Sequence, residues 1–122
     1  MRLTLERTEQ LYALEGVDCR VWTGADDEGT PLHCYVARVF EQENPRRLQL
    51  EPTHLVIEVD AVECRVWEGF DELGVPVSVY IARVAIHKDA MTPEVERRFA
   101  SRLRETHPPR LEIRTISTRL VL

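Results

Sequence analysis

Three cysteines and four histidines are the residues of this 122-residue chain best suited to nucleophilic or metal chemistry. His33 and Cys34 are adjacent, and a thiol beside an imidazole base is one arrangement that activates a nucleophile. Adjacent residues of a strand point to opposite faces, so these two side chains are not expected to meet. The other histidines have no short ligand spacing, and no serine or cysteine lies in a nucleophile elbow. The sequence therefore predicts no catalytic residue, no metal site and no cofactor.

The elements that would position any site occur twice in the sequence. Residues 19–39, CRVWTGADDEGTPLHCYVARV, return 45 positions later as residues 64–84, CRVWEGFDELGVPVSVYIARV. Followed upstream, the ungapped match joins residues 3–39 to residues 48–84, and 17 of the 37 aligned positions are identical. A match at a fixed period predicts two copies of one structural unit, over residues 3–40 and 48–85.

Each copy has the pattern of a three-stranded antiparallel meander with a short leading segment. Acidic residues and glycines at fixed offsets separate two runs rich in β-branched and aromatic residues, which is typical of a hairpin. A calcium loop is not indicated, because Leu73 stands where Glu28 does and alternating oxygen ligands are missing. A small sheet must cover its apolar face, so the two copies are expected to cover each other.

A helical pattern follows the second copy, over residues 92–106. Thr92 and Pro93 suit a helix N-terminus, and apolar residues then recur at helical spacing along one side. The other side carries the arginines Arg97, Arg98, Arg102 and Arg104. We interpret them as a solvated face balanced by nearby glutamates. The alternative is a docking surface for an acidic partner.

Composition and charge limit the cellular compartment and the classes of partner that we expect. The cysteines are odd in number, and Val79 stands where Cys34 does, so a small buried site is expected rather than a disulfide. The N-terminus lacks the apolar stretch of a signal peptide, and no apolar run approaches the roughly 18 residues of a membrane span. The net charge is -5 and the arginines are dispersed, so the sequence indicates no positively charged surface that would bind the phosphate backbone of a nucleic acid. We expect a cytoplasmic protein that binds neither nucleic acid nor membrane.

The register of the repeated hairpin decides which side chains share a face. If Gly24 lies opposite Pro31, then Cys19 and Val21 belong to the core face. The opposite face would present one arginine, one tryptophan and one tyrosine in each copy. These candidate binding residues are Arg20, Trp22, Tyr35, Arg65, Trp67 and Tyr80. Arginine and aromatic side chains dominate the hot spots of protein interfaces, which suggests a binding surface. The alternative is that the rings form a second layer of the core.

Residues 62–86 carry an R-V-W-E-G run, a G-V-P-V turn and an A-R-V-A run. In these motifs the stretch resembles a group of short, uncharacterised bacterial proteins with similar R-V-W-E-G, G-x-P-V and A-R-V-A-V runs. Residues 17–40 follow the same pattern less closely. The resemblance implies a bacterial origin and transfers no function.

These observations predict one domain over residues 1–122, of the α+β class and mainly antiparallel β. It would contain two tandem meanders with pseudo-twofold character, a C-terminal helix and a final strand at residues 110–122. The leading functional hypothesis is a non-catalytic protein-interaction or scaffolding module that binds a protein partner or self-associates as a homodimer. Two alternatives are a small-molecule-binding or enzymatic domain with a ligand between the meanders, and a phage-derived assembly component.

Overall fold

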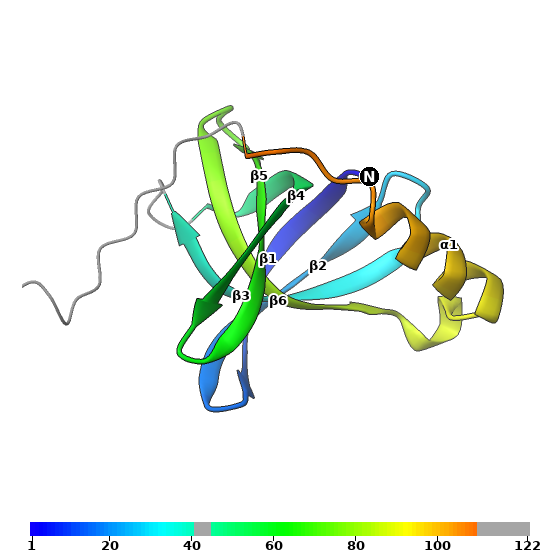
Figure 1. The fold of residues 1–122 in the computed structure, drawn as a ribbon, viewed down its shortest axis with the longest axis horizontal. Coiled ribbons are helices and arrows are strands. Elements are labelled where there is room, and N and C mark those ends of the chain that lie inside the picture. The colour runs from blue at the N-terminus through cyan, green and yellow to red at the C-terminus, as the bar shows by residue number, and fades with distance from the viewer. Residues whose placement is uncertain (41–44, 110–122) are drawn as a thin grey trace, which may run out of the picture.

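In the described residues of the computed structural model, six antiparallel strands close into a barrel, with one α-helix beside it (Figure 1). The structure describes residues 1–40 and 45–109, with the side chains of residues 38–40 left out. The strands are β1 (Leu3–Leu14), β2 (Val17–Asp26), β3 (Pro31–Phe40), β4 (Arg47–Val59), β5 (Val62–Asp71) and β6 (Pro76–Ile86). A short 3-10 helix, η1 (Lys88–Ala90), and the α-helix α1 (Pro93–Leu103) follow. The predicted mainly antiparallel α+β class is thus confirmed.

The order of strands around the barrel is β1-β2-β3-β6-β5-β4. Each sequence copy supplies three consecutive strands, and the pairs β1·β4 and β3·β6 join the two sets into one closed sheet. The predicted short leading segments are continuous with the first strand of each copy, so they form the beginnings of β1 and β4. Closure leaves the paired parts of these strands without a free edge, which removes a route to edge-to-edge aggregation.

The assumed hairpin register is also wrong, by one residue. Gly24 pairs with Leu32, and it is Ala25 that pairs with Pro31. Trp22 therefore lies opposite Cys34, on the same face, whereas Tyr35 lies opposite Val21 on the other face. Since side chains alternate along a strand, this slip moves the β2 side chains to the opposite face relative to those of β3, so Trp22 and not Val21 shares a face with Cys34.

Two clusters of buried side chains fill the molecule. The barrel interior contains Leu3, Leu5, Trp22, Leu32, Cys34, Val36, Leu48, Leu50, Trp67, Val77, Val79, Ile81 and Phe99. A second cluster lies near the β1–β2 and β4–β5 turns and contains Leu14, Val17, Cys19, Val59, Val62, Cys64, Val66 and Tyr80. Strands β2, β5 and β6 therefore bury side chains on both faces at different points along their length.

Bulges in β1 and β4 allow one strand to serve both clusters. The register of β1 against β2 shifts between Arg7 and Leu11, and that of β4 against β5 shifts at the aligned place, between Pro52 and Val56. In each bulge a threonine hydroxyl donates to a strand carbonyl oxygen: Thr8 to Val21 at 2.5 Å and Thr53 to Val66 at 2.7 Å. These bonds satisfy backbone acceptors that the interrupted ladder leaves open.

Helix α1 covers one end of the barrel (Figure 1). The hydroxyl of Thr92 accepts a hydrogen bond from the backbone N–H of Val95 at 3.1 Å, as expected of an N-cap. Phe99 is buried in the interior cluster and Leu103 packs against it. The helix is shorter than the predicted residues 92–106, and the predicted final strand at residues 110–122 lies outside the described residues. No helix in the described ranges has the length and apolar character that a membrane crossing requires.

Candidate binding pocket

The six residues predicted to form an exposed binding face are not exposed together. Trp22, Trp67 and Tyr80 each retain only 1 % of their accessible surface. Both tryptophans belong to the interior cluster and Tyr80 to the second cluster. The burial of these three rings contradicts the predicted exposed surface and agrees with the alternative interpretation, a second core layer.

The remaining three candidates, Arg20, Tyr35 and Arg65, are half-buried. Tyr35 stacks on Tyr12 with ring centroids 5.0 Å apart. The guanidinium of Arg20 donates to the carbonyl oxygen of Thr8 at 3.0 Å, and that of Arg65 donates to the carbonyl oxygen of Leu103 at 2.7 Å. Each arginine thus holds a backbone segment against β2 or β5.

The thiols are placed for packing and not for nucleophilic chemistry. Cys19, Cys34 and Cys64 are free and buried, and burial raises the pKa of each thiol above its ordinary value. Cys34 faces the interior, whereas the ring of His33 lies 4.5 Å from that of His87, centroid to centroid. A buried thiol with a raised pKa holds little thiolate, which is the reactive form.

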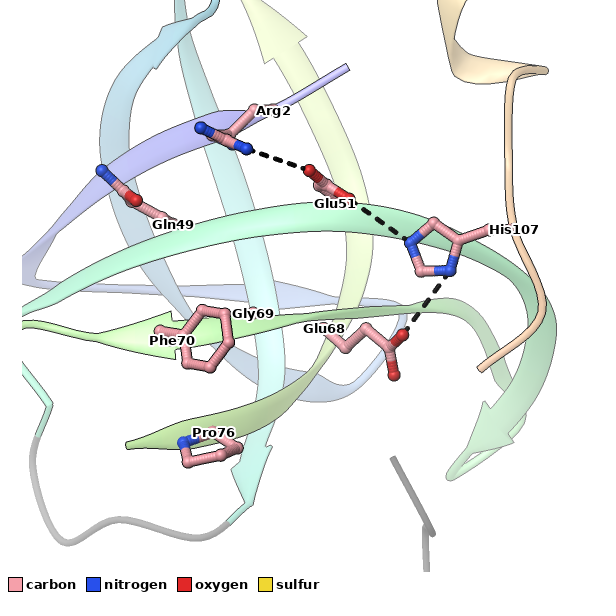
Figure 2. Close-up of a pocket in the computed structure, with 8 residues that line it drawn as sticks. All are labelled: Arg2, Gln49, Glu51, Glu68, Gly69, Phe70, Pro76 and His107. Carbon is pink, nitrogen blue, oxygen red and sulfur yellow. Dashed lines mark hydrogen bonds and ion pairs between the residues drawn. The ribbon is translucent and has the colours of Figure 1, made fainter. Parts of the chain in front are cut away.

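A pocket of about 330 Å³ opens on the outer face of the second half of the barrel (Figure 2). It is lined by Arg2, Gln49, Glu51, Glu68, Gly69, Phe70, Pro76 and His107. Strand alternation explains part of this lining, because Leu48 and Leu50 point into the barrel and Gln49 points out. Sequence reasoning did not identify this pocket.

Two carboxylates and one imidazole form the polar side of the pocket. Glu51 and Glu68 are direct cross-strand partners on β4 and β5, where like charges destabilise a sheet. His107 lies between them, with Nε2 3.6 Å from Glu51 and Nδ1 3.5 Å from Glu68 (Figure 2). Arg2 approaches the other oxygen of Glu51 at 3.3 Å. Glu68 is only 5 % exposed, so a charged group at the inner edge of this pocket is largely shielded from water.

His107 reaches the pocket because the chain after α1 runs back alongside β4. Thr53 and His107 form an isolated parallel bridge, and the N–H of His54 donates to the carbonyl oxygen of His107 at 3.0 Å. The pocket thus draws on Arg2, which precedes β1, on the second meander and on the segment after the helix. Residues so distant in sequence give no local pattern that would reveal the site.

The pocket lies where the two sequence copies differ. Glu51 and Glu6 are aligned, and the ion pair of Arg2 with Glu51 has a counterpart of the same length, 3.3 Å, between Arg47 and Glu6. At three other lining positions the copies differ: the first copy has Thr4 for Gln49, Thr23 for Glu68 and Ala25 for Phe70. The lining residues Gly69 and Pro76 are shared with the first copy. Comparing the copies position by position could have found this difference, because the shared residues are mostly core or turn residues.

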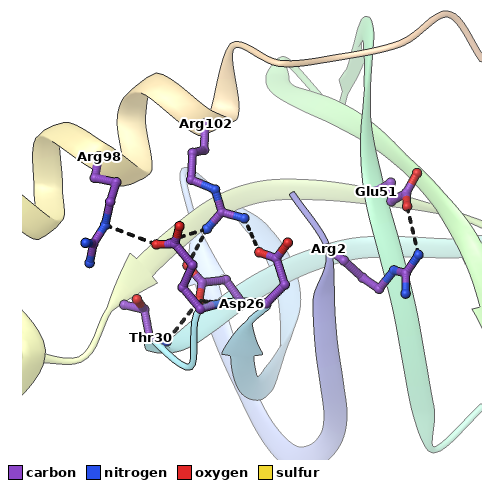
Figure 3. A network of polar contacts seen from close by, with 8 residues as sticks. Arg2, Asp26, Thr30, Glu51, Arg98 and Arg102 are labelled. Carbon is purple, nitrogen blue, oxygen red and sulfur yellow. Dashed lines mark hydrogen bonds and ion pairs between the residues drawn. The ribbon is translucent and has the colours of Figure 1, made fainter.

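A second polar network joins α1 to the acidic β2–β3 loop (Figure 3). The Arg102 guanidinium lies against Asp26 at 3.4 Å, Glu28 at 3.4 Å and Asp27. Arg98 pairs with Glu28 at 3.0 Å. Two of the four helix arginines therefore contact carboxylates of their own chain, in agreement with the interpretation of a balanced helix face.

Replacing Arg102 is expected to loosen α1 from the barrel. Arg102→Gln should lower the free energy of unfolding by about 1–2 kcal/mol at neutral pH, because several charge-assisted contacts are lost around a mostly buried guanidinium. Arg97→Gln is the matched control, since Arg97 is exposed and its guanidinium donates to a carbonyl oxygen of its own helix, that of Pro93. Urea unfolding at pH 7 measures both changes.

The same variant should respond to acid in a defined direction. The hydrogen bond from Arg102 holds the pKa of Asp27 below its ordinary value. A carboxylate with a lowered folded-state pKa stabilises the fold above its unfolded pKa, about 3.9, and loses that contribution as pH falls through the folded value. The stability gap between the native protein and Arg102→Gln should therefore narrow below about pH 4. A gap that stays constant down to pH 2 would contradict this role of Asp27.

Among residues 1–40 and 45–109, no three histidine, cysteine, aspartate or glutamate side chains are grouped so as to hold a metal ion. Comparisons of the chain with protein-family models, with curated proteins and with solved structures found no match.

Proposed function

We propose that this protein is a non-catalytic binding module whose pocket takes a cationic side chain, arginine or lysine, from a protein partner. The observation that carries the proposal is the pairing of a shielded carboxylate, Glu68, with an exposed aromatic ring, Phe70, in the pocket on the second copy. Phe70 is 54 % exposed, although most aromatic rings are kept from water.

The chemistry of the lining favours a cation. Glu51 and Glu68 bring two negative charges against the single permanent positive charge of Arg2. A guanidinium or ammonium group above the face of Phe70 would gain a cation–π contact and a charge-assisted hydrogen bond to Glu68. A volume of about 330 Å³ lies at the lower end of the range for small-molecule sites, which suits one side chain.

We also propose that the barrel arose from one duplicated unit with pseudo-twofold symmetry. In support, the β1·β2 pairs Leu3 with Asp26 and Leu14 with Val17 recur 45 residues later as Leu48 with Asp71 and Val59 with Val62. The joining pair β1·β4 is reciprocal as well, because Leu3 pairs with Leu50 and Leu5 with Leu48. Under duplication, the pocket residues are those in which one copy diverged.

The test uses N-acetyl-arginine amide as the probe, with the isosteric but uncharged N-acetyl-citrulline amide beside it. Titration followed by the amide signals of residues 68–70 should show saturable shifts with the arginine compound and none with the citrulline compound. Glu68→Thr and Phe70→Ala, which give the second copy the residues of the first, should each weaken binding about tenfold or more.

Glu63→Gln is the charge-matched control, because Glu63 is exposed on β5 and does not line the pocket. It should bind the arginine compound like the native protein. Equal shifts with arginine and citrulline compounds, or unchanged binding in both pocket variants, would overturn the proposal.

A further inference from the structure

A second hollow, of about 240 Å³, lies at the barrel end beside the C-terminus of α1. Its lining residues are Arg65, Trp67, Ile81, Ala82, Arg83, Val84, Leu103 and Arg104. Three arginines thus line one small space, from β5, β6 and the residue that follows the helix. It shares no lining residue with the pocket that holds Glu68.

The three arginines have no acidic counterpart in the part of the chain that the structure describes. No ion pair joins Arg65, Arg83 or Arg104 to a carboxylate of residues 1–40 or 45–109. By contrast, Arg2, Arg7, Arg20, Arg47, Arg98 and Arg102 all pair with carboxylates. A local excess of positive charge is unusual for a chain whose net charge is -5.

The two copies differ in this respect too. Arg20, the aligned counterpart of Arg65, lies 3.7 Å from the carboxylate of Glu9. His54 occupies the position aligned with Glu9, so the second copy lacks that carboxylate beside Arg65. A carboxylate equivalent to that of Glu9 is therefore missing beside Arg65, which lines the hollow.

The helix end accounts for only part of this charge. The carbonyl oxygen of Leu103 accepts a hydrogen bond from Arg65, and a helix C-terminus carries a partial charge of roughly -0.5. Three guanidinium groups carry three formal positive charges, so most of the charge is uncompensated. Trp67 and Ile81 are buried and form an apolar part of the lining, which strengthens electrostatic attraction above it.

We propose that this hollow, which we name the arginine hollow, binds a phosphate group. Its volume is below the roughly 300–1,000 Å³ typical of small-molecule pockets, so a compact anion or the terminal group of a larger ligand fits it best. A phosphate dianion offers acceptor oxygens in several directions, whereas a carboxylate offers two in one plane. Guanidinium groups on three separate elements therefore match phosphate better.

Inorganic phosphate is the probe, compared with acetate and chloride at equal pH and ionic strength. Titration of the full chain, followed by the amide signals of residues 82–84 and 103–105, should show saturable shifts with phosphate. Acetate should bind at least tenfold more weakly, and chloride should produce no saturable shift. A double variant, Arg83→Gln with Arg104→Gln, should lose at least tenfold in phosphate affinity, and Arg83→Gln alone should lose part of it.

Two controls separate this site from general charge and from the proposed cation pocket. Arg97→Gln removes an exposed helix arginine outside the hollow and should leave phosphate binding unchanged. Glu68→Thr should also bind phosphate normally, so failure of either proposal is distinguishable from failure of the other. Equal responses to phosphate and acetate, or a well-folded Arg83→Gln variant and double variant that both bind like the native chain, would overturn the inference.

Discussion

Gly69→Ala is expected to destabilise the barrel by more than about 3 kcal/mol, which is beyond the usual effect of overpacking. A Cβ atom at this position would overlap the backbone carbonyl oxygen of Gln49 on the neighbouring strand β4. Backbone of a paired strand cannot move aside without breaking the β4·β5 ladder, in which Gly69 pairs with Leu50. Gly24→Ala should behave alike, because its Cβ would overlap the carbonyl oxygen of Thr4.

Gly74→Ala provides the contrast for this experiment. Gly74 has a φ of 78° and open space around its missing Cβ, so the expected loss is the conformational one of about 1–2 kcal/mol. Urea unfolding of the three variants should place Gly69→Ala and Gly24→Ala well below Gly74→Ala in stability. A native-like midpoint for Gly69→Ala would show that β4 and β5 are not as close as described.

Trp67→Ala and Trp22→Ala should each lower the free energy of unfolding by about 3–5 kcal/mol. Both rings are 99 % removed from water in the barrel interior, and their loss would leave cavities among strands that are fixed by closure. Since domains of ordinary size are stable by about 5–15 kcal/mol, either change removes a large share of the total. Thermal unfolding and urea unfolding of each variant measure the loss in the free energy of unfolding.

Fluorescence of the same two variants gives an independent check, because each retains one tryptophan. If the variants still fold, the remaining ring should emit at short wavelength and resist acrylamide quenching. Phe70→Ala is the control for stability, since this exposed ring should contribute within about 0.5 kcal/mol. Long-wavelength, readily quenched emission from either tryptophan would contradict its place in the core.

Local features of the fold could be predicted from the sequence because they depend on neighbouring residues. A three-stranded meander in each copy requires a tight turn between its first two strands, and these turns lie at residues 15–16 and 60–61, where φ is positive, between 48° and 84°. The helix begins where Thr92 and Pro93 indicate. Barrel closure was not predicted, because the pairs β1·β4 and β3·β6 join residues far apart in the chain and leave no periodic trace.

The one-residue error in register has a local cause. The backbone N–H of Asp26 donates to the carbonyl oxygen of Thr30, and the Asp26 carboxylate accepts from the N–H groups of Glu28 and Thr30, both at 2.9 Å. The turn therefore closes between residues 26 and 30, and Ala25 comes opposite Pro31. The sequence prediction instead placed Gly24 opposite Pro31, because these two residues flank the loop.

The candidate site could not be predicted for a different reason. Alternation assigns one face of a strand to the core, but here both faces are buried at different points along β2 and β5. Trp22 and Val21 are buried side by side in the sequence, so burial cannot be assigned from period two alone. His107 joins the pocket only through tertiary structure, and no sequence pattern marks it.

The strand order of the closed barrel constrains the order in which the strand pairs can form during folding. The β1·β2 and β4·β5 hairpins join neighbouring residues and can form early, but the joins of β1 to β4 and β3 to β6 require both halves at once. The interior tryptophans are fully packed only after the pairs β1·β4 and β3·β6 have formed. A nascent chain that ends before β6 has five of the six strands and cannot close the barrel, so we expect the protein to gain most of its stability late in synthesis.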